Sequence, residues 1–173
     1  MKRIGLFIPT YNVENLVPSV LSKIPSDILS RIHTTYIFDN LSSDKTLAVV
    51  RDCLKKNWSG SFKVYQNESN YMLGGSTILA FDQAIEDQLD YLICMHSDGQ
   101  ADPKDLQKYF ELIDREDWDF ILGSRFMPNS QVQSYSRVRY GFNYLFALLQ
   151  QGLLRQRIYD IGAFVAFNIK TIK

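Results

Sequence analysis

Residues 89–103 read LDYLICMHSDGQADP, an apolar run that changes abruptly into a polar cluster. The first part, 89–96, is short and strongly apolar, which is typical of a central strand covered on both faces. The polar part begins with His96 and Asp98, at the carboxyl end of that strand. In open parallel sheets, ligands bind beyond the carboxyl ends of the strands. The stretch therefore predicts a buried parallel strand with a site at its end.

Strand and helix patterns alternate on both sides of this stretch. Strands are expected at 3–9, 33–39, 61–67, 89–96 and 118–125, and helices at 12–24, 42–57, 74–88, 102–116 and 137–151. Such alternation predicts an α/β fold with a mostly parallel central sheet and helices on both faces. The 173 residues contain no linker or repeat and are expected to form one domain.

Composition excludes some classes of function. Lys plus Arg and Asp plus Glu both total 19, so the net charge gives no reason to expect a nucleic-acid partner. Cys53 and Cys94 lack the spacing of metal ligands and are expected to be reduced thiols in a reducing compartment. The apolar stretch 140–154 is too short and too polar for a membrane span, which leaves an amphipathic or interfacial helix open.

Polar motifs follow every predicted strand. They are PTYN at 9–12, DNLSSDKT at 39–46, NYMLGG at 70–75, HSDGQADP at 96–103 and GSR at 123–125. Each is weak alone, because Asp39 is equally suited to cap the next helix and Gly74 with Gly75 to give a tight helix entry. The common glycine-rich nucleotide-binding signatures are absent.

Taken in order, the five motifs resemble those of the family 2 glycosyltransferases of the GT-A fold. The resemblance is greatest to the branch of dolichol-phosphate mannose synthase and bacterial polyprenyl-phosphate glycosyltransferases, and it extends from Ile8 to about Phe167. It implies a Rossmann-like three-layer α/β/α sandwich and a single catalytic domain over 1–173. Because such enzymes usually continue further, truncation at the C-terminus is an open alternative.

The resemblance implies a site for a nucleotide-diphosphate sugar. Asp39 would accept hydrogen bonds from the base or ribose, and Arg125 would face the diphosphate or remain an ordinary surface cation. The other residues implied in substrate binding are Pro9, Thr10, Tyr11, Gly74, Gly75 and Ser97. Asn40 and Leu41 replace an aspartate and a glycine of the family pattern, and the second replacement is expected to alter the turn.

His96 and Asp98 occupy the position of the family's metal-binding DxD motif. The resemblance implies that Asp98 binds Mg²⁺ or Mn²⁺, which would stabilise the diphosphate leaving group. For His96 three interpretations stay open: a metal ligand, a metal-free contact to sugar or phosphate, and a structural hydrogen-bonding group. Imidazole suits Mn²⁺ better than Mg²⁺. Gln100 and Asp102 are expected to order the turn and cap the next helix.

Acceptor chemistry depends on the late motif around Asp160. If the acceptor is a hydroxyl, inversion needs a general base, and Asp160 is the candidate catalytic residue by its order in the chain. A lipid phosphate is already ionised and needs none. Arg137 and Arg139 would then meet the acceptor phosphate or else be solvated residues at a helix start.

The resemblance as a whole implies an inverting, divalent-metal-assisted glycosyltransferase in cell-envelope polysaccharide biosynthesis. The donor would be a UDP- or GDP-sugar and the acceptor a polyprenyl phosphate or a glycan hydroxyl. We expect a cytoplasmic protein, with peripheral association at the cytoplasmic face of the membrane as an option, and an undetermined oligomeric state. The alternative is a truncated or degenerate nucleotide-sugar-binding domain without turnover, because His96, Leu41 and Met72 depart from the pattern.

Overall fold

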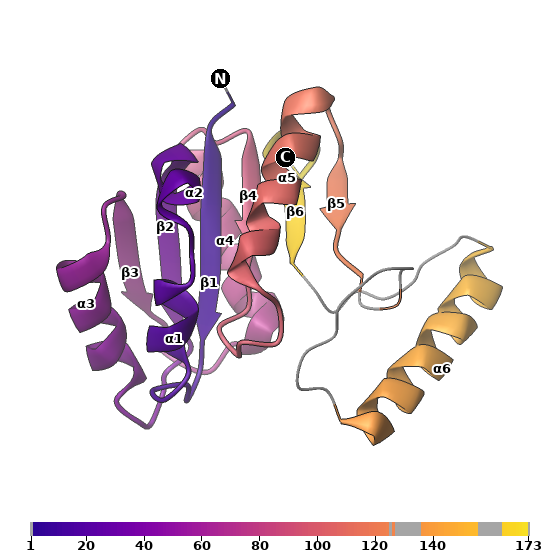
Figure 1. Cartoon of the computed structure of the whole chain (residues 1–173), viewed down its shortest axis with the longest axis horizontal. Helices are drawn as coiled ribbons and strands as arrows, with labels where there is room; N and C mark the ends of the chain where they lie inside the picture. The colour runs from indigo at the N-terminus through magenta and orange to yellow at the C-terminus, as the bar shows by residue number, and fades with distance from the viewer. Residues whose placement is uncertain (1, 125, 127–135, 156–163, 173) are drawn as a thin grey trace.

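A six-stranded sheet with helices on both faces forms the body of the molecule (Figure 1). The computed structural model describes residues 2–124, 126, 136–155 and 164–172. The strands are β1 (Ile4–Thr10), β2 (Ile32–Asp39), β3 (Phe62–Gln66), β4 (Tyr91–Cys94), β5 (Phe120–Leu122) and β6 (Val165–Asn168). The helices are α1 (Val17–Ser22), α2 (Ser26–Arg31), α3 (Thr46–Asn57), α4 (Met72–Glu86), the 3₁₀ turn η1 (Pro103–Asp105), α5 (Leu106–Arg115), α6 (Arg137–Leu154) and α7 (Ile169–Ile172).

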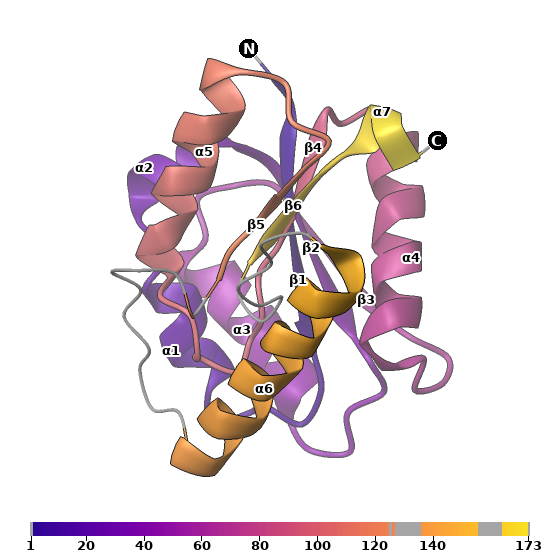
Figure 2. The same ribbon diagram turned by 90° about the vertical axis from the view of Figure 1, so that its right-hand side faces the viewer.

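The strand order is β3-β2-β1-β4-β6-β5. Strands β3, β2, β1 and β4 pair in parallel, whereas β6 is antiparallel to both of its neighbours. Helices α1, α2, α3 and α5 cover one face of the sheet, and α4 with α7 covers the other (Figures 1 and 2). The expected three-layer sandwich with a mostly parallel sheet is confirmed.

Alternation of side chains along β1 builds the two halves of the core. Leu6 and Ile8 pack with the helices of the first face, while Phe7 packs with Ala80 and Ala84 of α4 on the second. All four residues of β4 are buried, which confirms the central, doubly covered strand expected from residues 89–96. Because hydrophobic layers cover both faces, the carboxyl ends of the strands are held at one fixed edge of the sheet.

Strand β6 is the main element that the sequence patterns do not predict. It inserts between β4 and β5, pairing Cys94 with Val165 and Leu122 with Val165 in antiparallel register. Its four residues alternate only weakly, so periodicity alone is a poor guide to it. The six-residue helix α2 is likewise unpredicted, and the helix expected at 12–24 begins only at Val17.

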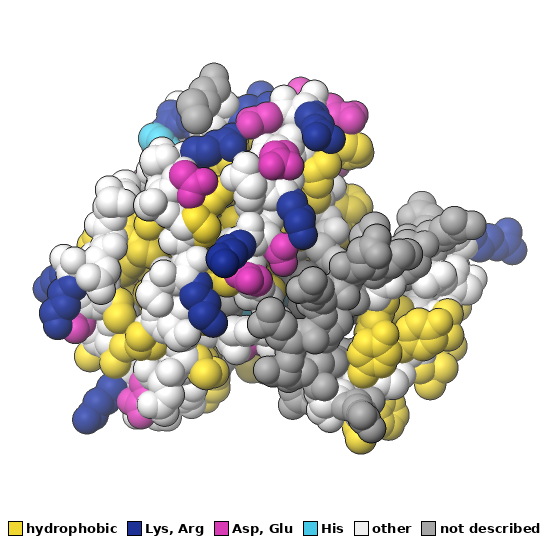
Figure 3. Space-filling model, viewed as in Figure 1, with side chains coloured by type: hydrophobic (Ala, Val, Ile, Leu, Met, Phe, Trp, Pro, Cys, Tyr) yellow, Lys and Arg dark blue, Asp and Glu magenta, His cyan; other side chains and the backbone are white. Residues whose placement is uncertain are grey.

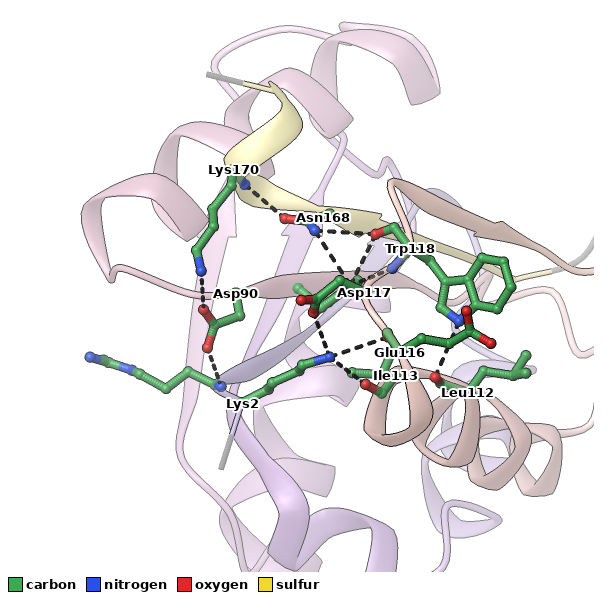
Figure 4. A network of polar contacts seen from close by, with 11 residues as sticks. Lys2, Asp90, Leu112, Ile113, Glu116, Asp117, Trp118, Asn168 and Lys170 are labelled. Atoms are coloured by element: carbon green, nitrogen blue, oxygen red, sulfur yellow. Dashed lines mark hydrogen bonds and ion pairs between the residues drawn. The ribbon is translucent and has the colours of Figure 1, made fainter.

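A polar network ties together the start of β1, the α5–β5 connection and the last strand (Figure 4). Lys2 forms an ion pair with Asp117 at 2.7 Å, and its Nζ also donates to the Ile113 carbonyl. The hydrogen bond to Asp117 raises the pKa of Lys2 and lowers that of Asp117. Asn168 of β6 donates to the Trp118 carbonyl at 3.2 Å. These contacts involve the amino end of β1 and therefore support the scaffold at the end opposite the predicted site.

Candidate functional site

The loops after β1 and β2 hold each other in place. The Asn12 amide donates to Ser42 Oγ at 3.0 Å, and the Ser43 amide donates back to Asn12 Oδ1 at 2.9 Å. The Lys45 amide donates to Glu14 Oε2 at 2.8 Å. Asn12 has a φ of 51°, in the left-handed region that asparagine tolerates better than most residues. The motifs YNVE and SSDK thus hydrogen-bond to each other, and together the two loops shape the carboxyl edge of the sheet.

Asp44, in the second loop, adds a further hydrogen bond between the two loops. Its carboxylate accepts hydrogen bonds from the Thr46 amide at 2.9 Å and the Glu14 amide at 3.2 Å. Partial burial acts to raise the pKa of Asp44, but these hydrogen bonds prevail and hold its pKa below the ordinary value. Asp44 therefore orders the entry to α3.

Asp39, expected at the base or ribose, ends β2 and is fully buried. Its Oδ1 accepts from Ser42 Oγ at 2.5 Å and its Oδ2 accepts from the Ser42 amide at 3.0 Å. It orders the β2–α3 turn and does not cap α3, which begins at Thr46 with Lys45 at its N-cap. Leu41 in this turn has a φ of 61°. Leucine is thus held in a left-handed conformation that glycine adopts without strain, and whether the turn differs from that of the family stays a prediction.

An amide network joins the ends of β2 and β3 to α4. Asn67 Nδ2 donates to Asn40 Oδ1 at 3.0 Å and to Ser76 Oγ at 2.9 Å, and Asn40 Nδ2 donates to Asn70 Oδ1 at 2.6 Å. The Tyr71 amide also donates to Asn40 Oδ1 at 2.8 Å. Asn40, Asn67 and Ser76 are buried, and each side chain is hydrogen-bonded, as buried polar groups require. The network is neutral and fixes the start of α4 against the sheet.

The segment after β4 carries the predicted metal-binding motif. Ser97 is buried, and its hydroxyl donates to the Pro9 carbonyl at 2.7 Å, which joins this segment to the end of β1. Asp98 is exposed, and its Oδ1 accepts from the Gln100 amide at 3.0 Å. Asp102 accepts from the Lys104 amide at 3.0 Å and caps η1, in agreement with its expected role.

These loops line an open cavity of about 290 Å³ at the carboxyl ends of β1 and β4. Six residues expected in the site line it: Pro9, Thr10, Tyr11, His96, Ser97 and Asp98. The remaining lining residues are Val13, Asn40, Asn70, Met72, Leu73 and Ser76. Within this described lining, Asp98 is the one charged side chain. The motifs PTYN and HSD are more than 80 residues apart in sequence, and they lie side by side in the lining of one pocket.

Gly74 and Gly75, expected in substrate binding, are not in the cavity lining and lie in the first turns of α4. A Cβ on Gly75 would lie 2.5 Å from the Tyr71 Cβ, whereas a Cβ on Gly74 would meet nothing within 4 Å. The same motif instead contributes Asn70, Met72 and Leu73 to the pocket. Their position directly after β3 is the signal that identifies them, because the glycines come later, inside the helix.

Two expected site residues, Arg125 and Asp160, lie outside the described residues. Their roles as a diphosphate contact and a general base therefore stay predictions. Helix α6 carries Arg137 and Arg139, whose side chains are likewise outside the description. The free thiols expected of Cys53 and Cys94 are present, on α3 and β4 respectively.

His96 and Asp98 alone are too few to hold a divalent cation. Oxygen atoms of a bound substrate and water would have to complete its coordination. No cluster of three or more His, Cys, Asp or Glu side chains suited to a metal occurs in the part of the chain that the structure describes. His96 and Asp98 do line the same cavity. Magnesium-type sites in nucleotide-dependent enzymes use one or two carboxylates, with phosphate oxygens and water completing the shell. One carboxylate and one imidazole beside the pocket are compatible with that arrangement.

The mostly parallel sheet and the pocket beyond its strand ends define a Rossmann-like α/β protein with a ligand site at the carboxyl edge. The chain belongs to the glycosyl transferase family 2, whose model matches residues 6–172. The family expected from the five ordered motifs is thus confirmed.

Curated relatives agree with this assignment, and solved structures share the fold. The UDP-N-acetylglucosamine–dolichyl-phosphate N-acetylglucosaminyltransferase of Methanococcus voltae is 28% identical over 134 residues, covering 72% of this chain and 52% of the relative. A mannosyltransferase from Pyrobaculum calidifontis, solved with GDP-Man and Mn²⁺, superposes with a TM-score of 0.64 at 14% identity, over 96% of this chain and 44% of that one. Glucosyl-3-phosphoglycerate synthase from Mycobacterium tuberculosis, solved with Mn²⁺ and UDP, gives 0.67 at 13% identity, over 98% and 57%.

The chain spans about half the length of the curated relatives that it matches. The solved structures share its fold at identities below 25%, and what they bind is a property of those proteins. Within the described residues, no helix combines the length and apolar character needed to cross a membrane.

Proposed function

We propose that the protein is an inverting glycosyltransferase that moves a sugar from a nucleotide-diphosphate sugar to a polyprenyl phosphate. The observation that carries the proposal is the cavity of about 290 Å³ in which Pro9, Thr10 and Tyr11 face the segment with His96 and Asp98. Membership of the family and the activity of the Methanococcus voltae relative support the reaction class. Both UDP- and GDP-sugars remain candidate donors.

The charge of the pocket supports a cation beside the diphosphate. A nucleotide diphosphate brings about two negative charges, and the described lining offers the Asp98 carboxylate without Lys or Arg. A carboxylate next to a diphosphate is repulsive unless a cation lies between them. His96 and Asp98 would hold Mg²⁺ or Mn²⁺ there, and the ion would supply charge stabilisation of the departing diphosphate. Arg125, outside the description, is proposed to share that role.

The neutral amide network suits the nucleoside end of the donor. Asn40 and Asn70 line the cavity with side chains already oriented by hydrogen bonds, so little ordering is needed when a base or ribose binds. Tyr11 is half exposed at the rim and offers a ring for stacking. The protein therefore orients the donor through fixed dipoles and one aromatic face.

The acceptor side is proposed to use an ionised lipid phosphate. Such a nucleophile attacks the anomeric carbon without a general base, and Asp160 would then orient the acceptor. A glycan hydroxyl would instead require Asp160 as the base. The two acceptors predict different effects of Asp160→Asn: a fall in rate by orders of magnitude for a hydroxyl, and a much smaller loss for a phosphate.

The test is a panel of UDP- and GDP-sugars, beginning with UDP-N-acetylglucosamine. Release of nucleotide is measured with a short-chain polyprenyl phosphate, with and without Mn²⁺ or Mg²⁺. We expect metal-dependent release that Asp98→Ala abolishes and that Asp102→Ala, a carboxylate used as a cap, retains. His96→Asp restores two carboxylates and is expected to shift the preferred ion from Mn²⁺ toward Mg²⁺ by roughly tenfold if His96 is a ligand.

The second candidate is a nucleotide-sugar-binding domain without turnover. Three departures from the family pattern favour it: His96, Leu41 and Met72, of which His96 and Met72 line the cavity. Calorimetric binding of a donor without nucleotide release, for every donor, ion and acceptor in the panel, would establish this alternative and exclude the enzyme.

A further inference from the structure

A second open cavity, of about 460 Å³, lies between α4 and the carboxyl end of β3, the edge strand of the sheet. We call it the β3–α4 cavity. Its lining comes from β2, β3, the following loop and α4: Phe38, Tyr65, Gln66, Asn67, Glu68, Tyr71, Leu79, Asp82 and Gln83. None of these residues lines the cavity of about 290 Å³ described above. Its size is that of small-molecule sites in proteins.

Three side chains of the β3–α4 cavity have unpaired acceptor atoms. Asn67 is only 5% exposed, and its Nδ2 donates to Asn40 and Ser76, which leaves its Oδ1 without a donor among the described residues. The carboxylates of Glu68 and Asp82 are exposed, and no hydrogen bond or ion pair joins them to another described residue. The described lining contains no Lys, Arg or His. The cavity therefore suits a ligand that donates hydrogen bonds and carries positive charge.

Aromatic rings form another part of the lining. Tyr65 stacks on Phe38 with ring centroids 4.7 Å apart, and its hydroxyl donates to Gln83 Oε1 at 2.6 Å, so its ring is held in place. Tyr71 is 41% exposed and lines the same cavity. The face of an aromatic ring carries partial negative charge and attracts cations. The rings and the carboxylates thus favour the same kind of ligand.

Acidic side chains elsewhere on the molecule are arranged differently. On the face covered by α1, α2, α3 and α5, acidic and basic side chains are interspersed (Figure 3). Arg31 and Asp114, for example, form an ion pair at 2.6 Å. Glu68 and Asp82 have no such partner in the described part of the chain. They also belong to no group of three or more His, Cys, Asp or Glu among the described residues that could hold a metal. An organic cation therefore suits them better than a metal ion.

We propose that the β3–α4 cavity binds a small organic cation, an alkylammonium or alkylguanidinium group on an apolar stem. Asn67 Oδ1 and the charges of Glu68 and Asp82 hold its N–H groups, and the ring of Tyr71 covers its stem. Asn67 and the Tyr71 amide also donate to Asn40, so this site shares a wall with the cavity of about 290 Å³. Binding of the cation needs neither a sugar donor nor turnover.

The test is an NMR titration of the full chain with butylammonium and butylguanidinium, and with 1-butanol as the uncharged match. We expect both cations to give saturable shifts of the backbone amide signals of 65–71 and 82–83 and of the side-chain amide of Asn67. Salt should weaken these responses, because it screens exposed charges. Binding of 1-butanol should be weaker by about tenfold or more, because it lacks the charge.

Removal of the two carboxylates tests the assignment of residues. Glu68→Gln with Asp82→Asn should weaken the binding of both cations by about tenfold or more. Both side chains are exposed and unpaired among the described residues, so the variant should fold as the wild type does. Glu111→Gln with Glu116→Gln is the matched control: it removes the same charge from exposed side chains outside the cavity and should leave binding unchanged.

The proposal fails on any of three results. The first is the absence of saturable shifts at the β3–α4 cavity with either cation. The second is an equal response to 1-butanol, or equal binding by the wild type and the Glu68→Gln, Asp82→Asn variant. The third is a stronger response of these residues to Mg²⁺ or Mn²⁺ alone, which would assign the carboxylates to a metal ion. Because the assay contains no sugar donor or acceptor, its failure is distinct from a failure of the proposed transferase activity.

Discussion

At the scale of single residues, Leu41 occupies a conformation that favours glycine. Its φ of 61° places a branched side chain in the left-handed region, at a cost of about 1–2 kcal/mol. Leu41→Gly should therefore raise the free energy of unfolding by up to about 1 kcal/mol, since greater freedom of the unfolded chain offsets part of the relief. Urea unfolding measures this change.

The control for that prediction is Leu16→Gly. Leu16 is similarly exposed but has a φ of −103°, where glycine relieves no strain. It should lower stability by a few tenths to about 1 kcal/mol. A lower stability of Leu41→Gly than of the wild type would show that apolar contacts of Leu41 outweigh the backbone strain.

Asp87 gives the protein an acid-sensitive contact. Its carboxylate accepts from Lys63 Nζ at 2.7 Å and from the Tyr36 hydroxyl at 2.6 Å, and these hydrogen bonds lower its pKa from the ordinary 3.8. A lowered pKa in the folded state adds stability above the unfolded pKa, and this stability is lost as pH falls through the folded pKa. Asp87→Asn should cost about 1 kcal/mol near neutral pH.

The pH dependence is the specific signature of this prediction. The difference in the free energy of unfolding between the wild type and Asp87→Asn should disappear below about pH 4, as measured by urea unfolding over a pH series. Asp52→Asn breaks only the exposed pair with Lys56 and should leave stability nearly unchanged at every pH. A gap of constant size down to acidic pH would show that the Asp87 charge is not the cause.

At the scale of elements, the two adjacent glycines of α4 should respond oppositely to alanine. Gly74→Ala adds a Cβ in open space and should stabilise the helix by about 0.5–1 kcal/mol. Gly75→Ala places a Cβ 2.5 Å from that of Tyr71 and should destabilise by about 1–3 kcal/mol. Thermal unfolding of both variants tests the pair. Similar shifts in one direction would contradict the geometry at Gly75.

The predicted elements are those with a clear apolar pattern in the sequence. Some contain a continuous apolar run, as β4 does, and others a repeated apolar face, as α5 does. Strand β6 and helix α2 lie in stretches whose patterns did not indicate a separate element, and β6 has an irregular burial pattern. Their place is decided by tertiary contacts, such as the pairing of β6 with β4.

The residues of the candidate site were likewise only partly predictable from the sequence. The rule that ligands meet strand ends identified Pro9 to Tyr11 and His96 to Asp98, which all line the cavity. It did not identify Ser76, which lies inside α4 and is oriented by a hydrogen bond from Asn67. Hydrogen-bond networks between side chains of different loops produce no periodic pattern in the sequence, so sequence patterns do not predict them.

At the scale of the whole molecule, the two thiols should report different motions. Burial raises the pKa of Cys94 to about 12, so almost no thiolate is present near neutral pH, and β4 lies in the centre of the sheet. We expect maleimide to label Cys94 only through global unfolding, with a rate that rises with urea as unfolding does. Cys53 is half-buried on α3 and should react in the native protein.

A Cys53→Ser variant allows the slow labelling of Cys94 to be measured alone. It should show a single labelling phase, limited by unfolding of the sheet, whereas Cys94→Ser should retain only the fast phase. Rapid modification of Cys94 without denaturant would indicate that the β4–β6 half of the sheet opens independently of the rest.

The position of β6 has a consequence for how the protein is made. Residues 165–168 lie late in the chain, yet they sit between β4 and β5, which are synthesised well before them. Translation adds roughly 5–20 residues per second, so for several seconds β4 presents an unpaired edge to the cell. Exposed strand edges recruit other strands. A chain that ends before Val165 would lack the partner of β4 on this side, and we expect it to aggregate more readily than the full chain.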